Sequence, residues 1–321
     1  YYGGGEIMKS KLVVVGAWGL FDHFMAMEKY PADGETICLD PHAVSAQQLF
    51  FGDCSGNIAA VAAGLGVETG LVTVVGWDFS SSGYRKHLEE LGVDLSGVTV
   101  LEQYPSGHNY NCFSPDGSGF CISQQGAAAH QQPGMIREEW FRDAAYTVVC
   151  EAFSPYTLKA LRCAGSWGST TVISGMVGDR NSLWQDFLQA ADILFINRSE
   201  FRRLVHLVGS EEALFRKFDL ERIFITCGAD GARIIDRSED LQIPVVQAEA
   251  VIDATGAGDA FVAGTIAGLL RGLEPQRAAG VGAAASSFII QKFGCQTNAP
   301  TWEQVRSRIE AQSETVGGRN P

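Results

Sequence analysis

The chain has 321 residues, 46% of them hydrophobic, and its 37 acidic residues outnumber 24 basic residues to give a net charge of −13. This length suits one large α/β domain or a large domain with a small appendage, and the acidic balance without a long basic run excludes a nucleic-acid backbone as partner. The eight cysteines contain no C-x-x-C pair, which argues against a zinc site and a disulfide framework and predicts free thiols in a reducing cytoplasm.

The N-terminal part of the chain predicts a buried strand. Residues 12–21 are apolar and follow two lysines, as in a signal peptide, but Asp22 comes directly afterwards and no small-residue cleavage site is present. Residues 12–15 therefore favour a first strand. Residues 1–7 fit no element, and we expect them to be a translated leader ahead of a native start at Met8. No run of about eighteen apolar residues occurs, so no membrane-spanning helix is predicted.

Strand and helix patterns alternate along most of the chain. Short apolar runs that are typical of buried parallel strands occur at residues 12–15, 70–75, 147–150, 170–173, 193–196 and 223–226. Stretches with helical spacing occur at residues 57–65, 83–91, 155–164, 183–191, 200–208, 261–270, 276–292 and 302–312. This alternation predicts an α/β fold in which a doubly wound, mainly parallel sheet is flanked by helices.

Two polar, turn-rich stretches interrupt the alternation, at residues 35–51 and 104–125. The second contains a predicted hairpin with strands at 109–113 and 120–123. We expect the two stretches to form a small antiparallel β lid over the strand ends, with ordinary surface loops as the alternative. The exposed edges of such a lid predict a homodimer that pairs through it. The main domain is then made of residues 8–34, 52–103 and 126–312, and residues 313–321 form a tail.

A turn of small residues lies between two carboxylates at residues 253–261, which read Asp-Ala-Thr-Gly-Ala-Gly-Asp-Ala-Phe. Gly256, Ala257 and Gly258 let the backbone approach a ligand, and the free N–H groups at a helix start attract an anion with roughly half a positive charge. Asp259 lies at the mouth of this site, where it can accept a proton from an attacking hydroxyl. The alternative is an ordinary strand-to-helix turn in which Asp259 only favours the helix dipole.

Several common catalytic motifs are absent from the sequence. None of the lysines follows a glycine, which excludes the Walker-A loop of P-loop ATPases. No H-E-x-x-H motif and no G-x-S-x-G elbow occur. Gly16-Ala17-Trp18-Gly19 follows the first strand, but it lacks the G-x-G-x-x-G spacing of a dinucleotide-binding turn.

Several motifs in one order resemble the ribokinase (PfkB) superfamily, which comprises ATP-dependent kinases of sugars and nucleosides. Residues 253–259 are similar to its D-x-T-G-A-G-D signature, and residues 52–59 are similar to its first signature, in which a Gly-Gly hinge precedes a substrate-binding Asn. Residues 197–200 match its N-x-x-E motif, and residues 226–231 match its T-x-G-x-x-G turn. The resemblance covers residues 11–309 and implies a ribokinase-like fold.

The resemblance implies a role for each matching residue. It implies that Asp259 is the catalytic base and that the anion hole is formed by Gly256, Ala257 and Gly258. It implies substrate contacts from Asp22, Gly52, Asp53 and Asn57, and we add Tyr110 as an aromatic side chain that could contact a base or pack inside the lid. It implies nucleotide contacts from Asn197, Thr226, Gly228, Gly231, Thr255, Gly256 and Gly258. Glu200 would organise Mg²⁺ through water, so ATP and Mg²⁺ are the implied cofactors, with K⁺ as a further candidate.

Finer features, at residues 76–79, 126–128 and 294–298, are similar to the microbial, adenosine kinase-like nucleoside kinases. They imply phosphorylation of the 5′-hydroxyl of a purine nucleoside in the cytoplasm. One alternative keeps the chemistry and changes the acceptor to a furanose sugar such as ribose or fructose. A second alternative is a ligand-binding protein on the same scaffold without turnover, and an oxidoreductase is weaker still.

Three positions depart from the pattern of the superfamily. Asp53 stands where the second hinge glycine is usual. One extra residue separates Gly16 from Asp22, which predicts a displaced loop after the first strand. Residues 174–176, Ser-Gly-Met, fall where relatives carry an Asp-Pro-Gly-like segment. None of these departures removes the proposed base or the anion hole.

Overall fold

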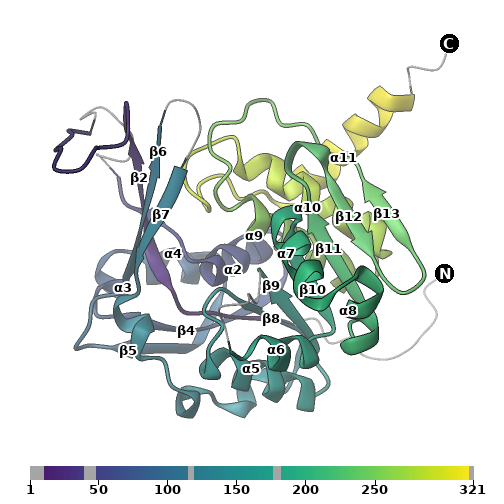
Figure 1. Ribbon diagram of the computed structural model, residues 1–321, viewed down its shortest axis with the longest axis horizontal. Coiled ribbons are helices and arrows are strands. Elements are labelled where there is room, and N and C mark those ends of the chain that lie inside the picture. Colours follow the sequence, from purple (N-terminus) through teal and green to yellow (C-terminus); the bar gives the residue numbers. More distant parts are fainter. Residues whose placement is uncertain (1–10, 40–47, 115–118, 176–181, 318–321) are drawn as a thin grey trace.

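The computed structural model describes residues 11–39, 48–114, 119–175 and 182–317, which form two sheets with flanking helices (Figure 1). The large sheet has nine strands in the order β13-β12-β11-β10-β9-β8-β1-β4-β5. In that order the strands are β13 (Asp240–Ile243), β12 (Ala232–Ile235), β11 (Arg222–Thr226), β10 (Ile193–Asn197), β9 (Thr170–Ser174), β8 (Ala144–Cys150), β1 (Lys11–Val15), β4 (Glu68–Gly76) and β5 (Asp94–Leu101). Neighbours from β11 to β5 are parallel, and β12 and β13 form an antiparallel edge. The predicted mainly parallel sheet is confirmed.

Helices cover both faces of the large sheet because its strands are apolar on both sides. In β1, Leu12 and Val14 belong to one hydrophobic core, whereas Val13 and Val15 belong to the other. The first core includes side chains of α2 (Cys54–Gly64), α4 (Tyr84–Glu90), α9 (Ala257–Leu270), α10 (Pro275–Ile289) and α11 (Trp302–Gly317). The second includes side chains of α5 (Pro155–Ser166), α6 (Trp184–Gln189), α7 (Arg198–Val208) and α8 (Glu211–Lys217). Near-continuous apolar strands thus produce a sheet buried on both faces.

The remaining helical segments are short, and one predicted boundary moves. They are α3 (Asp78–Ser81) and the 3₁₀ segments η1 (Gly126–His130), η2 (Pro133–Met135), η3 (Glu138–Phe141) and η4 (Gly228–Asp230). Helix α11 continues through residues 313–317, which the sequence assigned to a tail. Of the helices that the structure describes, none has both the length and the apolar character needed to cross a membrane.

A second sheet of four strands stands beside the large one, in the order β3-β2-β6-β7. Its strands are β3 (Phe50–Phe51), β2 (Gly19–Ala26), β6 (Gly107–Phe113) and β7 (Gly119–Gln124). Strands β2 and β3 are antiparallel, as are β6 and β7, but β2 and β6 are parallel. The small sheet is therefore mixed rather than purely antiparallel. It rises from one side of the large sheet, at the left of Figure 1.

Strand β7 forms one edge of the small sheet, and all six of its residues are exposed. Phe120 is 48% exposed and Ile122 is 58% exposed. This edge is the feature on which the expected pairing of two chains depends. Residues 115–117 of the hairpin turn predicted at 114–117 lie outside the described residues, as do the start expected at Met8 and residue Met176.

The large sheet brings several strand ends together. Glu151 follows β8, Gly175 follows β9, and Asn197 and Thr226 end β10 and β11. All four line one cavity. Parallel strands place their carboxyl ends at the same edge of a sheet, which is where α/β proteins bind ligands.

Candidate active site

The Gly-rich turn before α9 is held by its own first carboxylate. Asp253 Oδ1 accepts hydrogen bonds from the Thr255 backbone N–H at 3.0 Å and from the Thr255 hydroxyl at 2.6 Å. Asp253 Oδ2 accepts from the Gly294 N–H at 3.3 Å. The Thr255 hydroxyl, expected to contact a nucleotide, is therefore engaged inside the turn. The two carboxylates of the motif have different surroundings. Asp253 holds the turn in place, and Asp259 lines the cavity.

The start of α9 has the geometry of an anion site. Gly256 is the N-cap residue at φ 79°, and no side chain caps the helix. The Ala257 N–H donates to the Ala254 carbonyl at 3.2 Å, so it is already engaged, unlike the expectation that it serves the anion. Gly258 lines the cavity next to Asp259. The uncapped first turn and the helix dipole favour negative charge at this position.

Asp259 is buried in the first turn of α9, with 8% of its surface exposed. Its Oδ2 accepts a hydrogen bond from Asn57 Nδ2 at 2.9 Å, across 202 residues of sequence. Burial raises the pKa of Asp259 to about 7, and the hydrogen bond from Asn57 opposes that rise. A carboxyl group with a pKa near neutrality is suited to accept a proton in a reaction.

Asp22 lies on β2 of the small sheet, opposite α2. Its Oδ1 accepts from Asn109 Nδ2 at 3.0 Å and from Asn111 Nδ2 at 3.4 Å. Burial raises the pKa of Asp22. Gly52 lies against this carboxylate so closely that a Cβ there would be 2.3 Å from Asp22 Oδ2. Gly52 therefore contacts Asp22, and Asn57 contacts Asp259; the substrate contacts implied for these residues stay a prediction.

Asp53 and Glu151 form a strained acidic pair next to Asp259. They are the two residues other than glycine that have a positive φ in the described part of the chain, at 69° and 51°. One oxygen of each, Asp53 Oδ1 and Glu151 Oε2, is buried without a hydrogen-bond partner among the described residues. Burial and the neighbouring Glu151 raise the pKa of Asp53 well above its usual range, and burial raises the pKa of Glu151 to about 7. Two adjacent carboxyl groups with raised pKa values share a proton more readily than they ionise together.

We predict that Asp53→Gly stabilises the protein. At φ 69° and ψ 124° a side chain is strained by about 1–3 kcal/mol, whereas the extra freedom of glycine in the unfolded chain costs about 1 kcal/mol. Removing the buried carboxyl adds to the gain. Because the folded pKa of Asp53 is raised, its contribution to stability falls as pH rises, so the gain should be larger at pH 8 than at pH 5. Urea denaturation at both pH values measures the gain.

Asp53→Asn is the matched control because it keeps the strained backbone and removes the charge. Asp53→Asn should show the pH-dependent part of the gain in the free energy of unfolding. It should not show the part that comes from relief of backbone strain. A lower free energy of unfolding in Asp53→Gly at both pH values would show that the acidic pair stabilises the fold.

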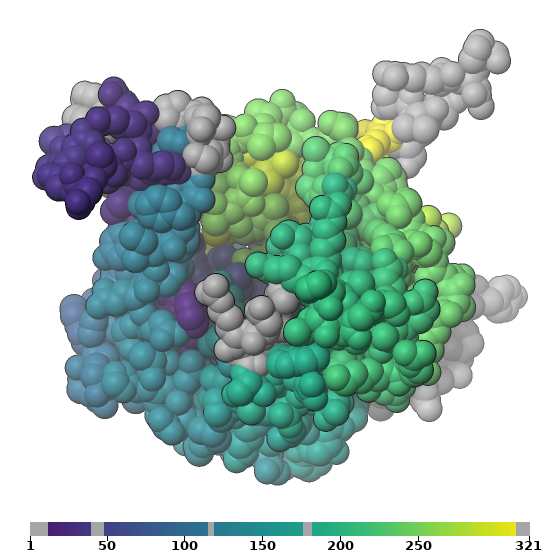
Figure 2. Space-filling view, in the orientation of Figure 1, coloured from purple at the N-terminus to yellow at the C-terminus, as the bar shows by residue number. Residues whose placement is uncertain are grey.

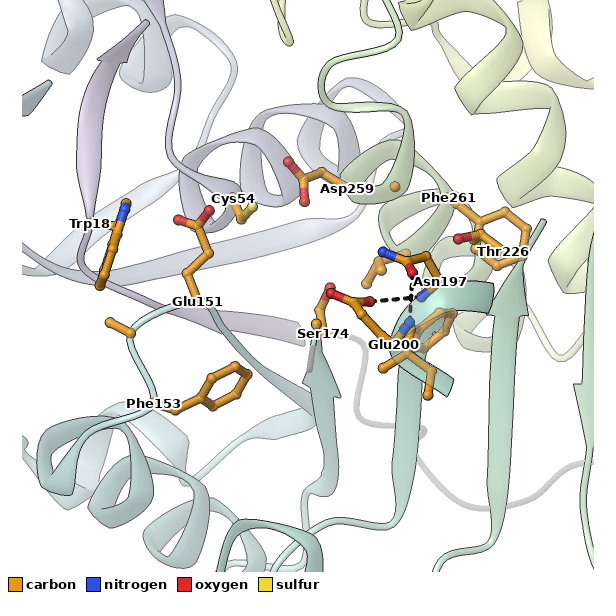
Figure 3. A pocket seen from close by; sticks show the side chains of 16 residues that line it. Trp18, Cys54, Glu151, Phe153, Ser174, Asn197, Glu200, Thr226, Asp259 and Phe261 are labelled. Atoms are coloured by element: carbon orange, nitrogen blue, oxygen red, sulfur yellow. Dashed lines mark hydrogen bonds between the residues drawn. The ribbon is translucent and has the colours of Figure 1, made fainter. Parts of the chain in front are cut away.

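A cavity of about 670 Å³ connects Asp259 and Glu151 with the strand ends of the large sheet, whereas Asp22, Asp53 and Asn57 do not line it. It is lined by Trp18, Cys54, Glu151, Ala152, Phe153, Ser174, Gly175, Phe195, Ile196, Asn197, Glu200, Thr226, Gly258, Asp259, Phe261 and Val262. Figure 3 shows Glu151, Cys54 and Asp259 on one side of it and Asn197, Glu200 and Thr226 on the other. Figure 2 shows the surface hollowed between the half with the small sheet and the half with α7.

The N-x-x-E motif caps α7. The Glu200 N–H donates to Asn197 Oδ1 at 2.9 Å, and the Asn197 N–H donates to Glu200 Oε2 at 2.8 Å, which is a capping box (Figure 3). Both residues also line the cavity. The motif thus has a structural role in addition to the nucleotide and metal roles that the resemblance implies.

The T-x-G-x-x-G turn lies between β11 and β12. Thr226 ends β11 and lines the cavity, but Gly228 and Gly231 do not line it. Gly231 has φ 81°, and a Cβ there would lie 2.1 Å from the Ile243 carbonyl oxygen. Gly231 is therefore required by the approach of β13, whatever ligand binds here.

Tyr110 and Phe24, two aromatic residues of the small sheet, lie in different environments. Tyr110 stacks on His23 with ring centroids 4.8 Å apart and remains partly exposed on the small sheet. Phe24 is 2% exposed and packs against Phe50, Phe113 and Phe293. Phe24 therefore lies in the core of the small sheet, whereas Tyr110 keeps exposed surface that a base could contact.

Sequence reasoning missed several residues of the site. Glu151, Trp18, Cys54 and Phe153 line the cavity, and Gln296 contacts Asn57. Glu151 and Phe153 follow the predicted strand at 147–150, so the rule that ligands bind at carboxyl ends of parallel strands could have identified them. No local pattern indicates that Gln296 reaches Asn57.

Comparison with known proteins gives this site a context. The family described as pfkB family carbohydrate kinase matches residues 21–302, a range that contains every cavity-lining residue except Trp18. The nucleoside kinase of Methanocaldococcus jannaschii is 27% identical over 314 residues, covering 96% of this chain and 98% of that protein. Its crystal structure has a TM-score of 0.81 to this chain at 26% identity and covers 96% of this chain and 100% of that chain.

Two further relatives differ in acceptor. The ATP-dependent ribose-1-phosphate kinase of Halopiger xanaduensis is 31% identical over 289 residues, covering 89% of this chain and 93% of that protein. The structure of Arabidopsis thaliana ribokinase complexed with ribose and ATP shares the fold, with a TM-score of 0.78 at 24% identity over 94% of this chain and 99% of that chain. Similar scaffolds therefore serve nucleosides, sugars and sugar phosphates.

Proposed function

Since this chain belongs to the pfkB family of carbohydrate kinases, we propose that it transfers the γ-phosphoryl group of ATP to the 5′-hydroxyl of a nucleoside. It is a phosphotransferase with an alcohol group as acceptor. The observation that carries the finer proposal is the position of Asp259. It lies at the uncapped start of α9, accepts a hydrogen bond from Asn57 and lines the same cavity as Glu200.

Asp259 would act as a base late in the reaction. A carboxylate cannot deprotonate a free alcohol in the ground state, but the hydroxyl becomes acidic as its bond to phosphorus forms. The proton then moves from the acceptor oxygen to the Asp259 carboxylate. Such general base catalysis contributes about 10²–10⁴-fold to the rate.

The start of α9 would stabilise the transferred group. The N–H groups of Gly256 and Gly258, together with the helix dipole, would face the equatorial phosphoryl oxygens. Among the described residues that line the cavity there is no lysine or arginine. We infer that, within the part of the cavity that the structure describes, backbone donors and a bound cation supply the positive charge.

Mg²⁺ fits this site as a partner of the nucleotide. Within the described part of the chain, no cluster of three or more His, Cys, Asp or Glu side chains could hold a metal ion. Glu200 uses Oε2 to accept the Asn197 N–H, so its Oε1 can accept from a metal-bound water. Mg²⁺ commonly binds through few carboxylates, several waters and the phosphates themselves, and it would neutralise phosphate charge here.

The acidic surroundings favour a neutral acceptor. Asp22, Asp53 and Glu151 lie near Asp259. The charges of Asp53 and Asp22 raise the pKa of Asp259, and the charge of Asp259 raises the pKa of Glu151. A vicinal diol can donate hydrogen bonds to such carboxylates, whereas a second phosphate would be repelled. This argument disfavours ribose 1-phosphate, and the similarity to the M. jannaschii nucleoside kinase supports a nucleoside over a free sugar.

An acceptor screen tests the proposal. With ATP and Mg²⁺, we expect kcat/KM for adenosine or another ribonucleoside to exceed that for ribose 1-phosphate by about 10²-fold or more, since juxtaposed like charges cost several kcal/mol. We expect it also to exceed kcat/KM for ribose and fructose, because these sugars lack a base that can contribute binding free energy to the transition state. ADP release measures turnover, and phosphorus NMR of the product locates the new phosphate. ATP without acceptor is the control for hydrolysis.

Each other outcome of the screen has a definite meaning. Preference for ribose 1-phosphate or a free sugar would replace the nucleoside as acceptor and leave the family unchanged. Binding of acceptors without ADP formation would support the alternative of a ligand-binding protein on this scaffold.

A further inference from the structure

A chain of buried hydrogen bonds leads from Asp259 away from the cavity to α4. Asn57 Nδ2 donates to Asp259 Oδ2 at 2.9 Å, and Gln296 Nε2 donates to Asn57 Oδ1 at 2.9 Å. Gln296 Oε1 is 3.1 Å from His87 Nε2. Asn57 is 3% exposed and Gln296 is 8% exposed, while His87 is partly buried. Four side chains from α9, α2, the loop after α10 and α4 are thus connected.

The carboxylate of Asp259, which is the final acceptor, determines the donor and acceptor roles along this series of hydrogen bonds. An ionised Asp259 accepts hydrogen bonds and donates none, so Asn57 must present its NH₂ group to Asp259 and its oxygen to Gln296. Gln296 must then present its own NH₂ group to Asn57 and its oxygen to His87. His87 Nε2 must carry the hydrogen that closes the chain. Gln296 therefore orients the amide of Asn57, and His87 orients the amide of Gln296.

Gln296 has a second bond that is consistent with the same orientation of its amide, which Asn57 and His87 already define. Its Nε2 also donates to the Tyr84 hydroxyl at 2.6 Å, and that hydroxyl donates to the Gly52 carbonyl at 2.9 Å. Both N–H groups of the amide are used, and its oxygen faces His87. Reversing the amide would break all of these bonds at once, and an unpaired buried donor or acceptor is costly.

Because Gly56 has no side chain, there is space beside α2 for the Tyr84 hydroxyl and the Gln296 amide. A Cβ on Gly56 would lie 2.1 Å from the Tyr84 hydroxyl oxygen and 3.7 Å from Gln296 Nε2. The backbone of α2 can therefore approach Tyr84 closely only with glycine at this position. The local sequence around Asn57 is adapted to the hydrogen-bond chain as well as to the cavity.

We propose that Gln296 is a positioning residue that holds the Asn57 amide with its N–H group on Asp259 and thereby keeps that carboxylate ionised for proton transfer. The inference rests on the proposed function in one respect, namely that Asp259 is the base. Gln296 touches neither Asp259 nor the residues expected to hold the nucleotide. Its effect on the reaction passes through Asn57.

The ionisable groups around Asp259 make its pKa depend on the hydrogen bond from Asn57. The groups that face it are the carboxyls of Asp22, Asp53 and Glu151 and the thiols of Cys54, Cys150 and Cys295. All of them are acids, so none offers a positive charge. The Cys54 thiol and the Asn57 amide are the side chains that lower the pKa of Asp259 against the effect of burial. Losing an oriented Asn57 should therefore raise that pKa further.

Gln296→Met tests the proposal because methionine has a similar length, no charge and no N–H donor. Asn57 then loses the donor that fixes its oxygen and is free to turn that oxygen toward Asp259. We expect the titration midpoint of Asp259 to rise by about one pH unit. Carbon NMR of protein labelled at the aspartate carboxyl measures the midpoint, with the Asp259 signal identified by its absence in Asp259→Asn.

Tyr84→Phe is the matched control. It removes the other acceptor of Gln296 Nε2 and leaves the bonds from Gln296 to Asn57 and from Asn57 to Asp259 in place. Its midpoint for Asp259 should equal that of the wild type. An unchanged midpoint in Gln296→Met, or equal shifts in both variants, would overturn the proposal, because packing alone would then account for Gln296.

Turnover gives a second readout. In Gln296→Met, kcat should fall on the acidic side of its pH profile and recover at higher pH, where Asp259 ionises again; a loss that is equal at all pH values would indicate a structural role only. If Gln296→Met does not fold, His87→Phe removes the far end of the chain and should shift the midpoint in the same direction. If the wild type transfers phosphate to no acceptor, the proposed function fails, while the NMR titration still decides the role of Gln296.

Discussion

Asp259→Asn is expected to lower kcat for phosphoryl transfer by about 10²–10⁴-fold and to leave the dissociation constant of the acceptor within about threefold of the wild type. Asparagine has nearly the same shape, and Asn57 can turn its amide to bond with it, so the first turn of α9 should keep its position. The variant lacks a group that can accept the proton of the attacking hydroxyl. Rapid-quench measurements of product and calorimetric titration of the acceptor separate chemistry from binding.

The same substitution should change the response of stability to pH. Burial raises the pKa of Asp259 to about 7 in the folded protein, whereas the unfolded chain has a value near 4. The folded state therefore holds the proton over this interval, and stability falls as pH rises through about 7. In Asp259→Asn this part of the fall should disappear.

Asp53→Asn is the control because it removes another buried carboxyl from the same cluster. Its kcat should stay within about tenfold of the wild type, since Asp53 has no proposed part in proton transfer. Near-wild-type kcat in Asp259→Asn would remove Asp259 from the mechanism. Equal losses in both variants would indicate a general electrostatic effect of the cluster.

The large sheet could be predicted from the sequence because its central strands are apolar on both faces. The runs at 12–15, 147–150 and 193–196 coincide with β1, β8 and β10 to within a few residues. Strands β5, β12 and β13 were missed. In β5 most residues are only partly buried, and β12 and β13 have only four residues each, so none of them gives the continuous apolar signal of a central strand.

The small sheet was predicted only in part, because its pairing is non-local. Strand β2 contains Asp22 and His23 and does not alternate in a regular pattern. Its register places Asp22 opposite Asn109, 87 residues later in the chain. Tertiary contacts fix such a register, and no property of residues 19–26 alone specifies it.

The motifs located the cavity, but they did not specify how its side chains bond. The pairs Asn57 with Asp259 and Asn57 with Gln296 are separated by 202 and 239 residues. Asp253 and Asp259 occur in one motif, yet one carboxylate binds the turn and the other faces the cavity. The direction of each side chain at the helix start decides between these two roles. The spacing of residues in the motif does not specify that direction.

Gly256→Ala is expected to lower kcat/KM by about 10²-fold or more. A Cβ on Gly256 would lie 2.7 Å from Cys295 Cβ and 3.0 Å from Cys295 Cα, so the start of α9 and the loop with Cys295 must move apart. That movement displaces Asp259 and the N–H groups of the anion site together. A misplacement of about 1 Å at a reacting group can cost about 10²-fold in rate. Steady-state kinetics with saturating ATP measures the loss.

Gly272→Ala is the matched control at the other end of α9. Gly256 and Gly272 have φ values of 79° and 75°, but a Cβ on Gly272 would meet no atom within 4 Å. Both substitutions should cost about 1–2 kcal/mol of stability through the positive φ, and only Gly256→Ala should lose turnover. The double variant Gly256→Ala with Cys295→Gly removes the closest of the contacts and keeps the backbone strain. Partial recovery of kcat/KM in that variant would show that turnover depends on the position of the helix start, whereas equal losses in the two alanine variants would assign the effect to strain alone.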